Sequence, residues 1–265
     1  MTALSAYVDG ISVLGPGLPD WPATESMLAG RAPYVPARTV LPVAMSLPSA
    51  ERRRAGRVIR LALATGLEAT SRAGLDPKSL VTIFTSSTGD GDNCHEICQT
   101  LASADRHISP TRFHNSVHNA AAGYWSIAIG AMASSTTLCA YDGSFAAGLL
   151  EAMVQVAVVQ QPILLIAYDT DYPSPLREVR PVPDAFGVAL VLAPTRTGRS
   201  MVKLKTQLRA SMNATLDHIE LEALRSAIPA ARSLPLLRLI ARQEYRAVGL
   251  EYLGSTSLCA QVLPC

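Results

Sequence analysis

Short apolar segments alternate along this chain with longer segments in which apolar residues recur at helical spacing. The short segments predict five buried strands, at residues 6–14, 80–86, 136–141, 163–168 and 186–193. Helices are predicted between most of these strands, at residues 49–74, 93–104, 120–133 and 144–160. Strands and helices that alternate in this way indicate βαβ crossovers. We therefore expect an α/β fold with a five-stranded, mostly parallel sheet and helices on both of its faces.

The pattern is weaker after Pro194. A strand is predicted there at residues 202–211, with helices at 216–227 and 234–242 and short strands at 250–252 and 258–263. The two short strands flank a Gly254–Ser255 turn and predict a C-terminal hairpin that extends the fold. Residues 19–43 and 171–183 are rich in proline, and we expect irregular segments there. No repeat or linker divides the chain, so we expect a single domain at residues 1–265.

The composition is apolar, with 49% hydrophobic and 17% charged residues. This balance predicts a large buried sheet or a large interface with a partner. The formal net charge is only +2 and the basic residues are scattered, which argues against nucleic-acid binding. The basic run at Glu51–Arg54 is interpreted as the solvated first turn of a helix. No segment offers about 20 uninterrupted apolar residues, so no membrane span is expected.

The cysteines show no disulfide spacing, and we expect reduced thiols in a cytoplasmic protein. Cys94 and Cys98 flank His95 in a segment that resembles a set of metal ligands. On a helix, however, His95 points away from both cysteines, and no second Cys and His pair is present. We therefore expect no metal and no cofactor.

Two histidines four residues apart, His114 and His118, lie in the segment FHNSVHN beside Asn119. The segment begins in a predicted loop and lacks the glutamate of a zinc-protease helix. We interpret it as a polar loop at the edge of a pocket or an interface. Three aromatic residues nearby are candidates either for that pocket or interface or for the core: Phe113, Tyr124 and Trp125.

The segment TTLCAYDGSFAAGLLEA at residues 136–152 predicts a strand, a sharp turn and an apolar helix. Enzymes often place a nucleophile at such a turn, because the helix N-terminus lowers the pKa of a thiol and stabilises an oxyanion. The turn here holds Tyr141, Asp142 and Gly143. Cys139 lies before the turn, in the predicted strand, where a cysteine behaves as a small hydrophobic residue.

Three segments together resemble the N-terminal half of a β-ketoacyl synthase. They are SPTRFHNSVHNAAAGYWSIA at 109–128, AYDGSFAAGLLEA at 140–152, and IPAARSLPLLRLIA at 228–241, the last with the closing Leu263-Pro264-Cys265. The chain resembles in particular the short, chain-length-factor-like relatives found in aryl polyene (xanthomonadin-type) pigment biosynthesis. The resemblance implies one half of a thiolase-type fold.

An active ketosynthase carries a cysteine nucleophile at the turn. The resemblance places Tyr141 at that position, or Asp142 if the register shifts by one residue, and neither can form a thioester with an acyl chain. The resemblance also implies two histidines in a second half, but only His218 follows residue 195, in an unrelated context. We therefore expect no catalytic residue and a subunit that is inactive on its own.

The resemblance implies that such a subunit pairs with a full-length β-ketoacyl synthase and bounds its acyl tunnel. Acyl carrier protein and a second copy of this chain are further candidate partners. In thiolase-type dimers the strand before the turn pairs with its counterpart, which here is Thr136–Ala140. The candidates to face the tunnel or the partner are Phe113, His114, His118, Asn119, Tyr124, Trp125, Thr136, Leu138, Cys139, Tyr141 and Phe145.

Two alternatives remain open from the sequence. One is a stand-alone acyltransferase or hydrolase, with Cys139 or Ser144 as nucleophile and His114 or His118 as base. The other is a homodimeric scaffold that binds an acidic acyl carrier protein through Arg52–Arg54.

Overall fold

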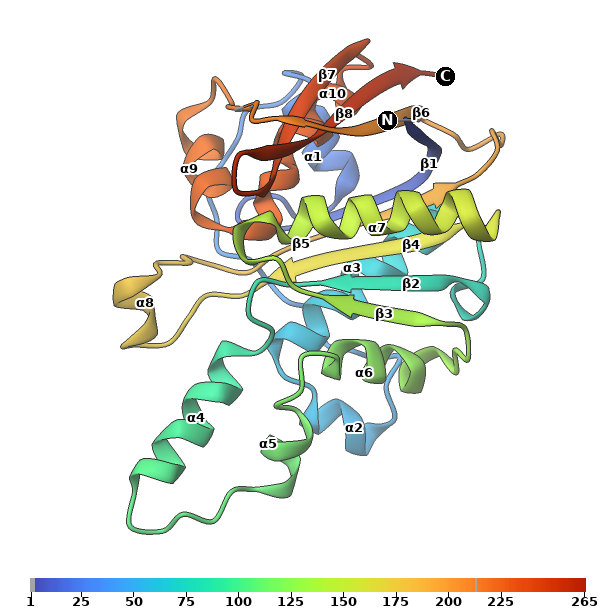
Figure 1. Cartoon of the computed structure of the whole chain (residues 1–265). Coiled ribbons are helices and arrows are strands. Elements are labelled where there is room, and N and C mark those ends of the chain that lie inside the picture. The colour runs from blue at the N-terminus through green and yellow to red at the C-terminus, as the bar shows by residue number, and fades with distance from the viewer. Residues whose placement is uncertain (1–2, 213) are drawn as a thin grey trace.

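In the part of the chain that the structure describes, residues 3–212 and 214–265, eight strands form one continuous sheet. Their order in this computed structural model is β3-β2-β4-β5-β1-β6-β8-β7 (Figure 1). The strands are β1 (Leu4–Leu14), β2 (Val81–Thr85), β3 (Ser135–Leu138), β4 (Ile163–Asp169), β5 (Phe186–Ala193), β6 (Val202–Ala210), β7 (Arg246–Leu253) and β8 (Thr256–Pro264). All five predicted main strands are present, as β1 to β5.

The sheet is mixed, whereas we expected a mostly parallel one. β2 is parallel to β3 and to β4, and the other neighbouring pairs are antiparallel. β4 and β5 are antiparallel because residues 170–185 contain only the four-residue helix α8 (Leu176–Val179), so the chain returns from the same end of the sheet instead of crossing over it. The α/β class is thus correct, but the predicted strand number and strand direction are wrong.

The chain after residue 194 adds three strands to the sheet. β6 pairs with β1 on one side and with β8 on the other. β8 and β7 form the predicted terminal hairpin, which turns at Gly254 with a φ of +55°. Glycine adopts a positive φ at little cost because it has no Cβ. The hairpin is confirmed, and it continues the same sheet instead of standing beside it.

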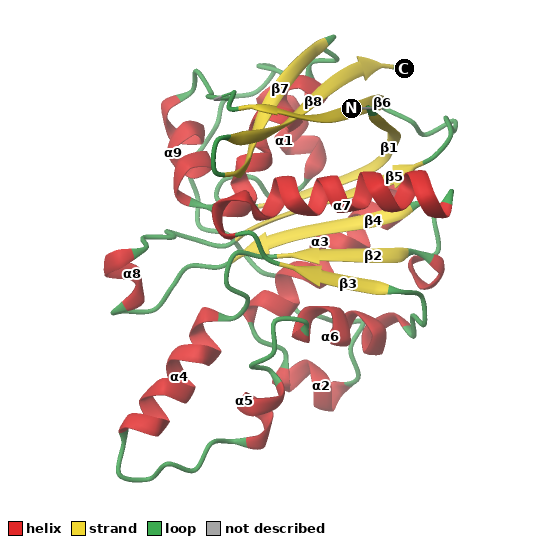
Figure 2. Ribbon diagram, in the orientation of Figure 1, coloured by secondary structure: helices red, strands yellow, loops and turns green. Residues whose placement is uncertain are grey.

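Helices cover both faces of the sheet, as predicted (Figure 2). Their bounds are α1 (Trp21–Leu28), α2 (Ser49–Arg54), α3 (Arg57–Ala73), α4 (Gly91–Ala102), α5 (Pro110–His114), α6 (Ala120–Ile129), α7 (Ser144–Val159), α9 (Ile219–Ala227) and α10 (Leu234–Ala241).

Two of the helix predictions were wrong. The segment expected to be irregular contains α1, which Asp20 caps by accepting a hydrogen bond from the N–H of Ala23 at 2.8 Å. The single helix predicted at residues 49–74 is two helices, α2 and α3. The break occurs because Ala55 is extended, with a ψ of 108°, and Gly56 is the N-cap of α3.

Each face of the sheet carries its own hydrophobic core. α1, α7 and α10 pack on one face, and α3 and α6 pack on the other. Along β4, Leu165 enters the first core and Leu164 the second, and every residue of the strand is buried. A strand buried on both sides is expected to be largely apolar, which is why the apolar run at residues 163–168 was a reliable signal.

α7 packs closely on β2 and β4. A Cβ at Gly148 would lie 2.7 Å from Thr85 Cγ2 and 2.9 Å from Leu165 Cδ1. The opposite side of the helix leaves Val154 and Val158 exposed. Residues 141–159 are long and apolar enough to cross a membrane by length and composition alone, but half of the apolar window is buried inside the fold, as in a core helix.

A buried carboxylate joins the ends of two strands to the C-terminal part of the chain. Asp169, the last residue of β4, is 2% exposed. It accepts hydrogen bonds from the N–H of Ser87 at 2.8 Å, the N–H of Ala230 at 2.9 Å and the hydroxyl of Ser86 at 3.2 Å. Burial raises the pKa of Asp169 to about 7, because the lost hydration outweighs these three donors.

Replacement of Gly148 by Ala should lower the free energy of unfolding by about 1–3 kcal/mol, because the new methyl group would overlap Thr85 and Leu165. Gly123 in α6 is the matched control, since a Cβ there would meet no atom within 4 Å. Gly123→Ala should raise the free energy of unfolding by about 0.5–1 kcal/mol. Urea denaturation of each variant measures both effects. A stabilising Gly148→Ala would contradict the close packing of α7.

The stability should also depend on pH through Asp169. Between its ordinary pKa of 3.8 and about 7, the folded chain retains a proton on Asp169 that the unfolded chain has lost. The free energy of unfolding should therefore fall as the pH rises through this window, by up to about 1.4 kcal/mol per pH unit, and level off above it.

Asp169→Asn should remove this part of the slope. Urea denaturation of both proteins from about pH 4.5 to about pH 7.5 makes the comparison. The slope is the measured quantity, because the Asn amide group would also face the N–H of Ala230 and lower the stability at every pH. Equal slopes in the two proteins would show that Asp169 is ionised throughout.

Candidate functional site at the turn before α7

The predicted strand, turn and helix are present as β3, the 3-10 turn η2 (Tyr141–Gly143) and α7. Tyr141 stands at the apex of the turn, with a φ of +51° and a side chain that is 61% exposed. A positive φ is rare for residues other than glycine and costs about 1–2 kcal/mol. The turn thus holds the ring of Tyr141 outward on a strained backbone.

Ser144 closes this turn. Its hydroxyl accepts a hydrogen bond from the N–H of Ala140 at 3.0 Å and donates one to the carbonyl of Tyr141 at 2.6 Å. The turn requires glycine at position 143, because a Cβ there would lie 2.0 Å from the carbonyl oxygen of Tyr252 in β7. The hydroxyl of Ser144, which is 2% exposed, is therefore engaged within the turn.

Two arginines hold the turn from outside. Asp142 pairs with Arg180 at 2.6 Å and with Arg232 at 3.0 Å. The guanidinium carbon of Arg180 also lies 3.7 Å from the centre of the Tyr141 ring, a cation–π contact. Arg232 forms a second ion pair with Glu251 of β7. Burial lowers the pKa of Arg232.

Cys139 follows β3 directly instead of lying in the strand, and its thiol donates to the carbonyl of Ser87 at 2.9 Å. His114 packs edge-on against the ring of Tyr124, with centroids 6.4 Å apart. His118 lies beside Gly89. Among the described residues, no hydrogen bond or ion pair joins either histidine to Cys139 or Ser144, so the arrangement shows no base in contact with a nucleophile.

The predicted tunnel and interface residues divide into buried and exposed groups. Tyr124, Trp125 and Phe145 are each 1% exposed and belong to the cores of this chain. Thr136 and Leu138 lie in β3 and are partly exposed, as is His118. The exposed candidates are Phe113, His114, Asn119, Cys139 and Tyr141.

A hollow of about 540 Å³ lies between α6 and β3. His118 and Asn119 stand at its wall, and the remaining lining side chains are small: Ala122, Gly123, Ser126, Ser135 and Thr137. The Nε2 atom of His118 is buried there and has no hydrogen-bond partner within the described residues. The hollow brings two of the predicted residues together beside the edge strand.

β3 is the edge strand at one end of the sheet. It carries no charged residue, and exposed hydrophobic side chains lie on the elements around it. These are Phe113 (69% exposed), Val117 (53%), Ile127 (46%), Met132 (96%), Val154 (38%) and Val158 (76%). α4 and α5 extend away from the sheet on the same side (Figure 1), and α4 buries only Gly91 and Asn93. This side therefore exposes an uncharged strand edge with apolar surroundings.

Three residues of the site were missed by the sequence analysis: Asp169, Arg180 and Arg232. Arg180 and Arg232 lie 38 and 90 residues from Asp142, so no local pattern connects them. The one available signal for Asp169 was its position at the end of a continuous apolar strand.

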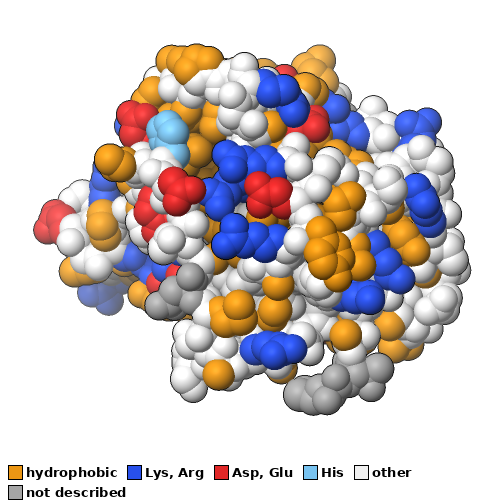
Figure 3. Space-filling view, turned by 90° about the horizontal axis from the view of Figure 1, so that it is seen from above, with side chains coloured by type: hydrophobic (Ala, Val, Ile, Leu, Met, Phe, Trp, Pro, Cys, Tyr) orange, Lys and Arg blue, Asp and Glu red, His pale blue; other side chains and the backbone are white. Residues whose placement is uncertain are grey.

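The basic run at residues 52–54 is partly engaged by the chain itself. Arg52 donates to the carbonyl of Leu47 at 2.9 Å, and Arg54 pairs with Glu51 at 3.1 Å. Figure 3 shows the opposite end of the molecule, where Lys and Arg side chains near the middle lie beside Asp and Glu. Within the described residues, no group of three or more His, Cys, Asp or Glu side chains could hold a metal ion. Cys94 and Cys98 are free, as are the other cysteines.

Several solved structures share this fold. One is a ketosynthase (ApeO) in complex with its chain length factor (ApeC) from Xenorhabdus doucetiae, in which the matched chain has a TM-score of 0.74 and 23% identity, over 97% of this chain and 99% of that one. Another is the ishigamide ketosynthase/chain length factor, with a TM-score of 0.71 and 13% identity, over 98% of this chain and 99% of that one.

A third is the AntDE:AntF complex of a type II polyketide synthase acyl-carrier protein with its ketosynthase. Its matched chain has a TM-score of 0.76 and 12% identity, and both chains are covered completely. At these identities the likeness establishes the thiolase-like α/β fold. A search of curated proteins found no significant match to this sequence.

The family is established by the sequence. The model of the β-ketoacyl synthase N-terminal domain matches residues 27–247, a range that extends from α1 to β7 and includes the turn at Tyr141. The chain therefore belongs to the β-ketoacyl synthase N-terminal domain family.

Proposed function

We propose that this chain is a non-catalytic partner of a full-length β-ketoacyl synthase, a chain length factor in aryl polyene or related polyketide or fatty-acid-type biosynthesis. The observation that carries the proposal is the turn before α7. It keeps the strained apex conformation, but the residue at that apex is Tyr141. The proposed role is to shape the acyl tunnel of the partner synthase.

The chemistry at the turn supports this proposal. Condensation requires a thiolate nucleophile, an oxyanion hole and a proton donor or base in one cavity. The ring of Tyr141 lies under the guanidinium of Arg180, and the carboxylate of Asp142 is held between two arginines. A stand-alone enzyme that uses Ser144 is disfavoured, because its hydroxyl already makes two hydrogen bonds inside the turn.

The edge strand supports pairing with a partner. The carbonyl of Ser134 accepts a hydrogen bond from the N–H of Thr82 in β2, and that of Leu138 from the N–H of Ser86 just after β2. Since backbone groups alternate along a strand, the N–H and C=O groups of Ser135 and Thr137 point away from the sheet. β7, at the other edge, carries Arg246 and Glu251, and charged residues discourage strand pairing. β3 has no such protection, which favours an interface there.

The apolar surroundings of β3 support a protein partner over solvent. Exposed apolar side chains such as Ile127, Met132 and Val158 surround the edge on several elements, and patches of this kind mark interfaces. The similar structures include two of a ketosynthase with a chain length factor. The free cysteines agree with the proposed cytoplasmic location.

Thr137→Pro should weaken the complex with a co-expressed full-length ketosynthase at least about tenfold, because it removes an outward N–H and fills the strand edge. Thr137→Val is the matched control, since it keeps the N–H and should bind like the wild type. Affinity copurification and quantitative binding measure the effect. If both variants bind equally well, the pairing does not use β3.

Tyr141→Ala should lengthen the acyl product of the assembled complex, because it removes a large, exposed side chain from the apex of the turn. Tyr245→Ala is the control: Tyr245 is 70% exposed and lies outside the turn, so this variant should leave the product length unchanged. Mass spectrometry of carrier-bound products gives the length distribution. An unchanged distribution for Tyr141→Ala would refute a role of this residue in the tunnel.

A further inference from the structure

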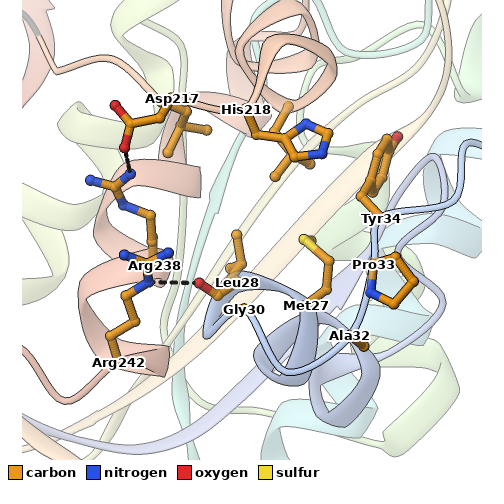
Figure 4. A pocket seen from close by; sticks show the side chains of 12 residues that line it. Met27, Leu28, Gly30, Ala32, Pro33, Tyr34, Asp217, His218, Arg238 and Arg242 are labelled. Carbon is orange, nitrogen blue, oxygen red and sulfur yellow. Dashed lines mark hydrogen bonds and ion pairs between the residues drawn. The ribbon is translucent and has the colours of Figure 1, made fainter.

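A cavity of about 450 Å³ lies between α1, α9 and α10 (Figure 4). These helices are at the end of the molecule opposite β3 (Figure 1). The cavity is lined by three segments distant in sequence: residues 27–34, residues 216–221 and α10. It has no part in the function proposed above, and its volume is at the lower end of the range for small-molecule sites.

The inner surface of this cavity is apolar. It is formed by Met27, Leu28, Leu216 and Leu221, which are between 3% and 9% exposed. These side chains come from α1, from the segment before α9 (Leu216) and from α9 itself (Leu221), so the cavity lies where these elements meet. An apolar surface of this kind favours a ligand with a hydrocarbon body.

Two rings form one side of the cavity. Tyr34 and His218 are in edge contact, with centroids 5.5 Å apart and planes at 83°. The hydroxyl of Tyr34 donates to the carbonyl of Pro16 at 3.0 Å, which fixes the tyrosine ring. Fixed aromatic edges and faces favour an aromatic ligand over a flexible chain.

Two guanidinium groups stand on the other side, away from these rings (Figure 4). Arg238 lies on α10, and Arg242, four residues later, caps the C-terminal end of that helix. The side chain of Arg238 is only 18% exposed, and its Nε atom is buried with no hydrogen-bond partner among the described residues. A buried donor without a partner is costly, and a ligand acceptor would relieve that cost.

The ion pair that Arg238 forms within this chain is weak. Its Nη1 atom contacts Asp217 at 2.9 Å, but the side chain of Asp217 is 94% exposed, and water screens such a pair. Arg242 donates from Nε to the carbonyl of Leu28 at 3.0 Å, which keeps that guanidinium at the cavity. The cavity therefore combines a fixed positive side with an apolar interior.

We propose that this cavity binds a small aryl carboxylate. The carboxylate would accept hydrogen bonds from the buried Nε and the neighbouring Nη of Arg238, a geometry that arginine offers and lysine does not. The apolar body would lie over Met27 and Leu221, with its ring against Tyr34 and His218. Asp217 competes with this carboxylate for the same guanidinium.

Calorimetric titration of the full chain with cinnamate tests the proposal. Saturable one-to-one binding is expected, and Arg238→Gln should weaken it at least about tenfold through loss of the charged donor. Arg106→Gln is the matched control, since this exposed arginine lies after α4, outside the cavity, and its loss should not change the affinity. Cinnamyl alcohol, which has the same body without the charge, should bind at least about tenfold more weakly than cinnamate.

A second variant, expected to bind more tightly, excludes misfolding as the cause of a lost affinity. Asp217→Asn removes the competing carboxylate from an exposed position and should tighten cinnamate binding several-fold. No binding to the wild-type chain, or unchanged affinity in both Arg238→Gln and Asp217→Asn, would overturn the proposal. Octanoate binding as tight as that of cinnamate would overturn the aromatic assignment. The test needs no ketosynthase partner, so its result is independent of the proposed chain-length role.

Discussion

The turn before α7 depends on one interaction, the carboxylate of Asp142 between the guanidinium groups of Arg180 and Arg232. Both arginines are largely buried, with 15% and 14% of their side chains exposed, so removal of the carboxylate would leave two buried charges without this partner at a cost of a few kcal/mol. The same contact connects the turn to the loop before β5 and, through Arg232 and Glu251, to β7. It offsets the strain of about 1–2 kcal/mol at Tyr141.

The turn has the backbone shape of a catalytic turn, but the side chain at its apex is not a nucleophile of the kind that condensation requires. The apex is strained, the helix follows at once, and Gly143 allows the carbonyl of Tyr252 to approach closely. These features place a side chain at a defined position in front of α7. The side chain so placed is a phenol in contact with a cation, which can occupy space but cannot accept an acyl group as a thiolate does. The uncharged edge strand beside this turn is the surface that we propose for binding another protein.

The sequence predicted those elements that depend on a pattern of neighbouring residues. β4 is buried on both sides, and its continuous apolar run at residues 163–168, before Asp169, made it recognisable. The turn was recognisable because Tyr141, Asp142 and Gly143 are adjacent between an apolar strand and an apolar helix. The direction of β5 was not recognisable, because it depends on where the loop after Asp169 returns to the sheet. Trp125 and Tyr124 stood next to a polar segment in sequence, yet α6 turns both into the core. The two arginines that bind Asp142 come from distant segments, so the residues next to Asp142 in the sequence could not predict these ion pairs.

We propose that this chain belongs to a condensing complex without carrying acyl groups itself. This proposal is tested most directly by incubating the complex of this chain and a full-length ketosynthase with labelled acyl-carrier protein, followed by peptide mass spectrometry of both subunits. If this chain is non-catalytic, we expect label on the nucleophilic cysteine of the synthase and none on this chain. A stable acyl group on Cys139, Tyr141 or Ser144 would contradict it.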